Sequence, residues 1–174
     1  MQLSPAAIRT TTPLSVTVNV STALDLARPS TGMRRAEHLE VGFGTPDARL
    51  DASVDVYDPL WDGPVSEPDS PEDWHATRSA SASPAIRSAV SALQASVAAL
   101  DLGKLRTSET APGSYATFHL RYAERPENLG TLRPYQDRDG SWVVPVRTSI
   151  GDLFQNPALL PIVDAARAVL DAAR

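Results

Sequence analysis

The chain has 174 residues, of which 42% are hydrophobic and 21% are charged, and its formal net charge is −5. These values are typical of one globular domain of ordinary size and argue against wholesale disorder. The chain holds no cysteine, which excludes disulfides, thiolate catalysis and cysteine metal sites. A nucleic-acid surface needs clustered cations, so the acidic balance predicts no nucleic-acid partner.

The sequence also lacks the signals of a membrane or secreted protein. No stretch approaches the ~18–20 apolar residues that cross a bilayer, and MQLSPAAIRTTTPLSV at the start has no apolar run of signal-peptide length. We therefore expect no membrane partner and a cytoplasmic location. We interpret 1–174 as a single domain with an N-terminal extension over 1–13.

Alternation of apolar and polar residues predicts three strands in the first half. In LSVTVNVS, residues 14–21, every second side chain is apolar and the others are uncharged polar groups. HLEVGF at 38–43 and ARLDASVDVY at 48–57 repeat the pattern, and the turn residues GTPD separate them. The last two strands are predicted to form an antiparallel hairpin. The uncharged first strand would accept another strand if it lay at an open edge, but it could equally be internal or covered by residues 1–13.

The period then changes from two to about 3.6. Ser83 is suited to cap the start of a helix, Pro84 fits the first helical position, and Gly103 is a candidate C-terminal stop. One apolar stripe follows at helical spacing: Ile86, Val90, Leu93, Val97 and Leu100.

The second half predicts three more strands. SYATFHLRY at 114–122 alternates, and 131–135 and 141–147 flank the Asp-Gly turn of QDRDG. Pro134 and Pro145 each remove a backbone donor, which favours the edge of a sheet for this hairpin.

A second amphipathic helix is predicted after Pro161, with a short helical turn near 149–154 before it. The predicted fold is an α+β two-layer sandwich. It has an antiparallel sheet of about six strands in the order βββα-βββα, with both amphipathic helices on one face.

Residues 58–83 form a Pro-rich acidic loop in this interpretation. Two of the chain's three tryptophans, Trp61 and Trp74, lie in it. A tryptophan buries on the order of 200 Å², worth several kcal/mol at ~25 cal/mol/Å², so two solvated ones are costly. Either the rings pack back onto the core, or they anchor a partner with Asp62 and Asp73 at the rim.

The polar face of the predicted sheet offers a second candidate site. His38, Glu40, Asp55 and His119 would point to this face and could hold a metal or perform acid–base chemistry. The simpler interpretation is a solvated face of an antiparallel sheet, because no metal-binding spacing supports a cluster. No catalytic residue is assigned, and no cofactor is expected.

The leading hypothesis is therefore a non-catalytic protein-binding or assembly module, such as an acidic adaptor, chaperone or immunity-type protein. Its expected partner is another protein or a second copy of this chain. One alternative is a structural subunit of a larger particle, viral or from a secretion machine. The other is a small metal-dependent or acid–base enzyme that uses the polar sheet face.

Overall fold

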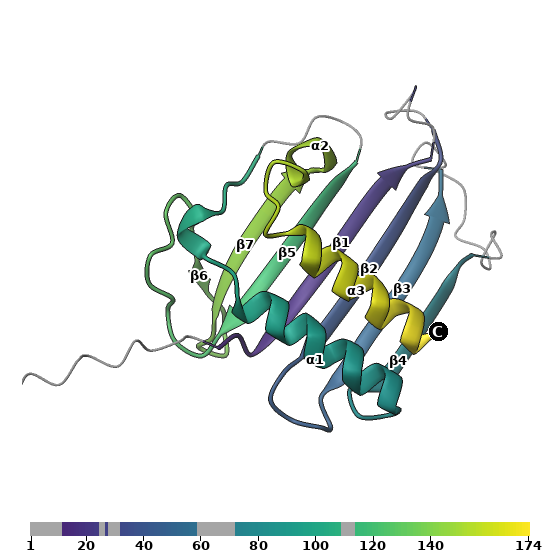
Figure 1. Cartoon of the computed structure of the whole chain (residues 1–174), viewed down its shortest axis with the longest axis horizontal. Helices are drawn as coiled ribbons and strands as arrows, with labels where there is room; N and C mark the ends of the chain where they lie inside the picture. The colour runs from purple at the N-terminus through teal and green to yellow at the C-terminus, as the bar shows by residue number, and fades with distance from the viewer. Residues whose placement is uncertain (1–11, 25–26, 28–31, 59–71, 109–113) are drawn as a thin grey trace, which may run out of the picture.

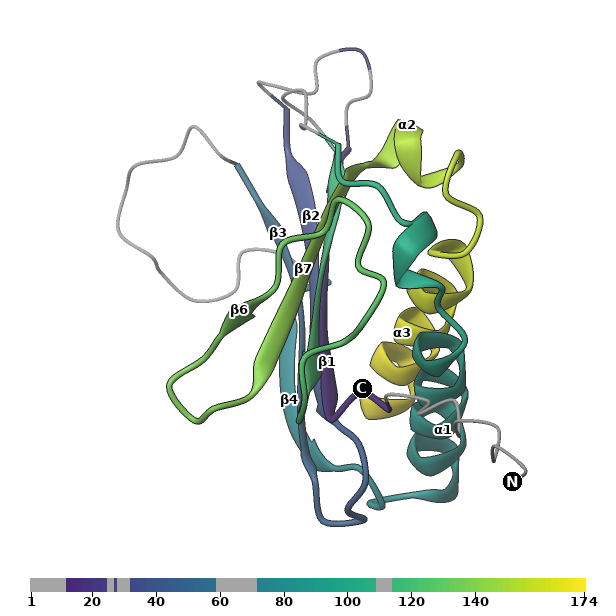
Figure 2. The same cartoon turned by 90° about the vertical axis from the view of Figure 1, so that its left-hand side faces the viewer.

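The computed structural model describes residues 12–24, 27, 32–58, 72–108 and 114–174. They form one antiparallel sheet of seven strands, with helices packed on one side of it (Figures 1 and 2). The strands are β1 Ser15–Ala23, β2 Arg34–Gly42, β3 Arg49–Tyr57, β4 Trp74–Ser79, β5 Tyr115–Tyr122, β6 Tyr135–Gln136 and β7 Trp142–Ser149. The helices are α1 Pro84–Ala98, the 3₁₀ turn Leu102–Lys104, α2 Ile150–Leu153 and α3 Leu160–Ala173. The strand order is β4-β3-β2-β1-β5-β7-β6.

The predicted α+β class with an antiparallel sheet is confirmed, but the strand count and the element order were wrong. The missed strand, β4, lies inside the segment predicted as a loop and pairs with β3 from Val54 to Arg49. Its sequence WHATRS has little apolar alternation, so pairing with β3 rather than pattern defines it. The four-residue helix α2 is a third helix beyond the two in the predicted order.

The first strand lies at the centre of the sheet. β1 pairs with β2 on one side and with β5 on the other, so it is internal rather than an edge that could accept a partner strand. Val16, Val18 and Val20 point to the helices and are at most 4% exposed. The uncharged polar alternation of β1 thus reflects a central position with one solvated face.

The two long helices cover the apolar face side by side (Figure 1). Ser83 caps α1 as predicted, because its hydroxyl accepts from the Ile86 amide at 3.1 Å. Gly103 does not end α1, which closes at Ala99, and this prediction was wrong. Gly103 instead lies in the 3₁₀ turn, where a Cβ atom would come within 3.0 Å of the Asn128 carbonyl oxygen.

Both edges of the sheet are protected within the described part of the chain. β6 covers only the first two residues of β7, Trp142 and Val143. Further along β7, Pro145 has no backbone N–H, and the Ser108 amide donates to the Arg147 carbonyl at 2.9 Å. At the other edge, the Arg78 guanidinium donates to the Thr77 carbonyl of β4 at 3.1 Å. These contacts discourage pairing with a foreign strand.

Candidate binding site

The face of the sheet opposite the helices, which we call the open face, carries the polar side chains. None of the described helices lies on it (Figure 2). The strand registers align one row of side chains across six strands. In spatial order this row is His75, Ser53, His38, Asn19, Thr117 and Arg147.

A hollow of about 330 Å³ lies on this face, over β2, β1, β5 and β7. This volume falls at the lower end of the range typical of ligand sites. Among the described residues that line the hollow, Glu37 is the only acidic one, and its carboxylate bonds groups on the helix side. The open-face side chains in the lining include Asn19, His38, Tyr57, Tyr115, Thr117 and Arg147.

Arg147 supplies the positive charge of the hollow. Its guanidinium lies over the Tyr115 ring, 4.8 Å from the centroid, a distance typical of cation–π contact. Its side chain is exposed and, among the residues that the structure describes, has no carboxylate partner. The guanidinium is therefore positioned by an aromatic ring at the lining of the hollow.

The opposite side of the hollow is formed by a fixed histidine. His38 Nδ1 lies 2.6 Å from Asn19 Oδ1. Because an amide oxygen accepts, this contact places the proton on Nδ1 and leaves Nε2 as the second polar atom. Tyr57, which is 40% exposed, borders the same side.

Ser21 adds a buried polar group beneath the hollow. The residue is 5% exposed and stands between Ala36 of β2 and Tyr115 of β5. In the described part of the chain its hydroxyl has no hydrogen-bond partner. Among the described residues, Ser21 therefore adds an unpaired polar atom to the lining of the hollow.

Arg121 also points to the open face, but its charge is neutralised. It contacts Asp137 at 2.9 Å and Asp139 at 3.6 Å, both in the turn between β6 and β7, and it donates to the Ser141 hydroxyl. The Arg138 amide, and then Arg121, lower the pKa of Asp137. Arg147, by contrast, has no carboxylate partner among the described residues.

The predicted metal or acid–base residues share the open face without converging. His38 is bonded to Asn19, Glu40 stands one row away opposite Asp51, and the Asp55 carboxylate lies 3.5 Å from the Ser53 hydroxyl. No group of three histidine, aspartate or glutamate side chains suited to a metal occurs within the described ranges.

His119 lies opposite Thr17 of β1 and Pro145 of β7. Burial, and secondarily the Arg121 charge, lower its pKa below the ordinary value for histidine. His119 is therefore neutral at pH 7 and adds no charge to the hollow.

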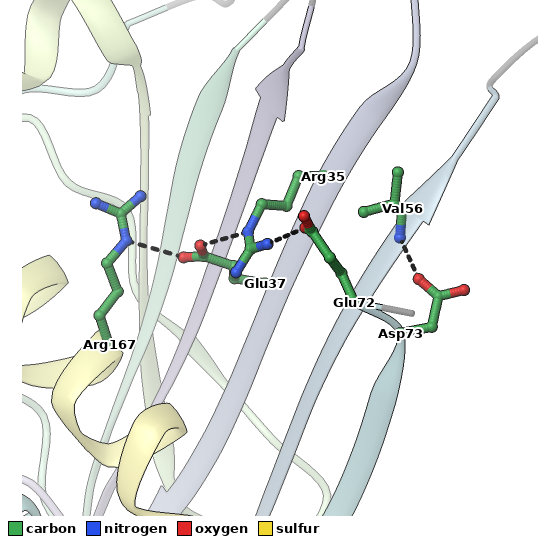
Figure 3. A network of polar contacts seen from close by, with 6 residues as sticks. All are labelled: Arg35, Glu37, Val56, Glu72, Asp73 and Arg167. Carbon is green, nitrogen blue, oxygen red and sulfur yellow. Dashed lines mark hydrogen bonds and ion pairs between the residues drawn. The ribbon is translucent and has the colours of Figure 1, made fainter. Parts of the chain in front are cut away.

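The predicted partner anchors are distributed differently. Trp61 and Asp62 lie outside the described residues. Trp74 opens β4, is half-buried opposite Val54 and packs against the core. The Asp73 carboxylate accepts from the Val56 amide at 2.7 Å, which joins β3 to the residue preceding β4 (Figure 3). Both described residues have structural contacts, and their partner role stays a prediction.

A charge network ties the helix layer to the sheet on the opposite side from the hollow. Glu37, whose side chain is 10% exposed, accepts from Arg167 of α3 at 3.0 Å and from Arg35 at 3.1 Å (Figure 3). Arg35 also contacts Glu72 at 2.5 Å, next to Asp73. The network joins α3, β2 and the segment before β4, so its charges serve the fold.

No family model, curated protein or solved structure matches the chain. Within the described ranges, no helix is long and apolar enough to cross a membrane.

Proposed function

We propose that this protein is a non-catalytic protein-binding module that engages its partner through the open face of the sheet. The observation that carries the proposal is the hollow on that face, where Arg147 is positioned by Tyr115 without a carboxylate partner among the described residues. Arginine and tyrosine are typical of the residues that contribute most to protein interfaces.

The protected edges support the use of a face. Strand addition needs a row of free backbone donors and acceptors. In the described chain, Pro145, Ser108 and Arg78 interrupt that row at the two edges. Interrupted edges are less suited to continuing the sheet into a particle, which supports the binding module over the structural subunit.

The spacing of the titratable groups also favours binding over catalysis. General acid–base chemistry needs two such groups within reach of one substrate atom. His38 and His119 lie on different strands separated by β1, and Glu40 is one row from His38. Neither histidine contacts a carboxylate in the described structure, so the open face supplies contact groups rather than a catalytic pair.

The proposal is tested by capture with matched variants. The immobilised full-length chain, Arg147→Glu and Arg87→Glu are exposed to the same native lysate. Arg87→Glu is the control, because it makes the same substitution at an exposed position of α1 in the helix layer. We expect one set of proteins to be retained by wild type and by Arg87→Glu and to be lost from Arg147→Glu.

If the retained proteins were lost from Arg87→Glu alone, the interface would lie on the helix layer and the proposal would be contradicted. Equal retention by all three chains would also contradict it. A fourth chain, Trp61→Ala, tests the hypothesis that this tryptophan anchors a partner; proteins lost from this chain alone would make Trp61 the anchor.

A further inference from the structure

We infer that the open-face hollow recognises a carboxylate side chain of an acidic peptide segment in the partner, with Arg147 as the carboxylate-binding residue. This inference rests on the proposed function and specifies the chemistry of the partner. The planar guanidinium presents paired donors that match the two oxygens of a carboxylate. Because Tyr115 stacks under the guanidinium, little side-chain freedom is lost when the pair forms.

Arg147 places a positive charge on β7 at one end of the hollow, and His38 stands on β2 near the other end. The Asp55 carboxylate lies opposite Ala36 of β2 and therefore beyond the His38 end of the hollow. An anion bound at Arg147 is thus remote from Asp55.

The net charge of −5 does not override this local arrangement. Exposed charges are screened beyond about 8 Å at physiological ionic strength. Glu40 and Asp51 lie on β2 and β3, on the far side of β1 from Arg147. The global charge instead suppresses nonspecific binding of acidic peptides, so any binding that occurs reports a specific site.

The size of the hollow favours a peptide over a small free anion. From His38 across Asn19 and Thr117 to Arg147 the row spans three strand spacings, about 14 Å. A free anion would occupy only the Arg147 end of a hollow of about 330 Å³. A peptide segment would place its carboxylate at Arg147 while its backbone meets the polar groups of Asn19, Thr117 and His38.

The test uses the full-length chain and defined probes at physiological ionic strength, where the remote acidic groups are screened. Backbone amide NMR signals are followed during titration with N-acetylated, C-amidated hexaglutamate, hexaglutamine and inorganic phosphate. We expect hexaglutamate to shift the signals of Asn19, Thr117 and Arg147, and hexaglutamine to leave them in place. Arg147→Gln should weaken hexaglutamate binding about tenfold or more, because it removes a charge-assisted contact.

Two further variants control the assignment. Arg87→Gln should bind hexaglutamate like wild type, and Arg147→Lys should bind with intermediate strength because it keeps the charge but loses the planar fork. The amide spectra also show that each variant is folded. Phosphate binding without hexaglutamate binding would overturn the inference in favour of a small free anion, and shifts confined to other surfaces would overturn it outright.

Failure of this inference differs from failure of the proposed function. If wild type does not bind hexaglutamate but Arg147→Glu loses the lysate partners, the open-face interface stands and the acidic-peptide inference fails. A chain that binds hexaglutamate at Arg147 but shows no partner loss in that variant would contradict the proposed function instead.

Discussion

Glu37 offers the sharpest test of how the helix layer is joined to the sheet. Its carboxylate accepts from two guanidinium groups, those of Arg35 and Arg167, and each charge-assisted bond contributes about 1.5–3 kcal/mol. In Glu37→Gln one bond is retained in neutral form, and the amide NH₂ group meets the second guanidinium. The side chains of Arg35 and Arg167 are 35% and 48% exposed, so they regain water on losing their partner.

The expected loss therefore stays below the about 3–5 kcal/mol of a fully buried broken pair. We expect a decrease of about 2 kcal/mol in the free energy of unfolding, which lowers Tm by about 4–8 °C at this chain length. Urea unfolding and a thermal scan followed by circular dichroism measure both values.

A matched control lies three residues away on the same strand. Glu40 is exposed and has no hydrogen bond or ion pair within the described chain, so Glu40→Gln should change the free energy of unfolding by less than about 0.5 kcal/mol. Equal losses in the two variants, or no loss in Glu37→Gln, would refute the assignment of Glu37 as the link between α3 and β2.

Three further predictions concern other elements. His119 has a lowered folded-state pKa, so the unfolded chain binds the proton more readily and stability falls as the pH drops through about 6.5. In His119→Gln, the free energy of unfolding from urea titrations should therefore depend less on pH between about 7.5 and 5.5. An unchanged pH dependence would contradict this. Trp74→Ala should cost about 2 kcal/mol, less than a fully buried tryptophan, and unchanged stability with lost partner capture would instead make Trp74 a partner anchor. Ser83→Ala removes the cap of α1 and should lower Tm by about 2–4 °C, with Ser83→Asp restoring it; an unaltered Tm in the alanine variant would show that the cap contributes nothing.

The sequence predicted best those elements whose side chains alternate cleanly. Val16, Val18 and Val20 face the helices, and β1 follows its prediction closely. β2 begins at Arg34, four residues before the predicted start. The pattern missed these residues because Arg35 and Glu37 place charges on the inward side and break the apolar alternation. The pattern could not show that these charges are paired with a residue 130 positions away in α3.

The candidate site was less accessible to sequence reasoning. The polar face was expected, and His38 and His119 do lie on it, but the hollow depends on strand order. Tyr115 and Arg147 are 32 residues apart and meet only because β5 pairs with β7. No local motif encodes such a contact, since it requires the register of two strands and one rotamer.

The central claim is that the open face, rather than the helix layer, meets the partner. The most direct measurement places a photo-crosslinking amino acid at Thr117 on the open face or at Ser88 on exposed α1 and irradiates each chain in native lysate. We expect a crosslinked partner band from Thr117 and none from Ser88. A band from Ser88 alone would contradict the claim and place the interface on the helices.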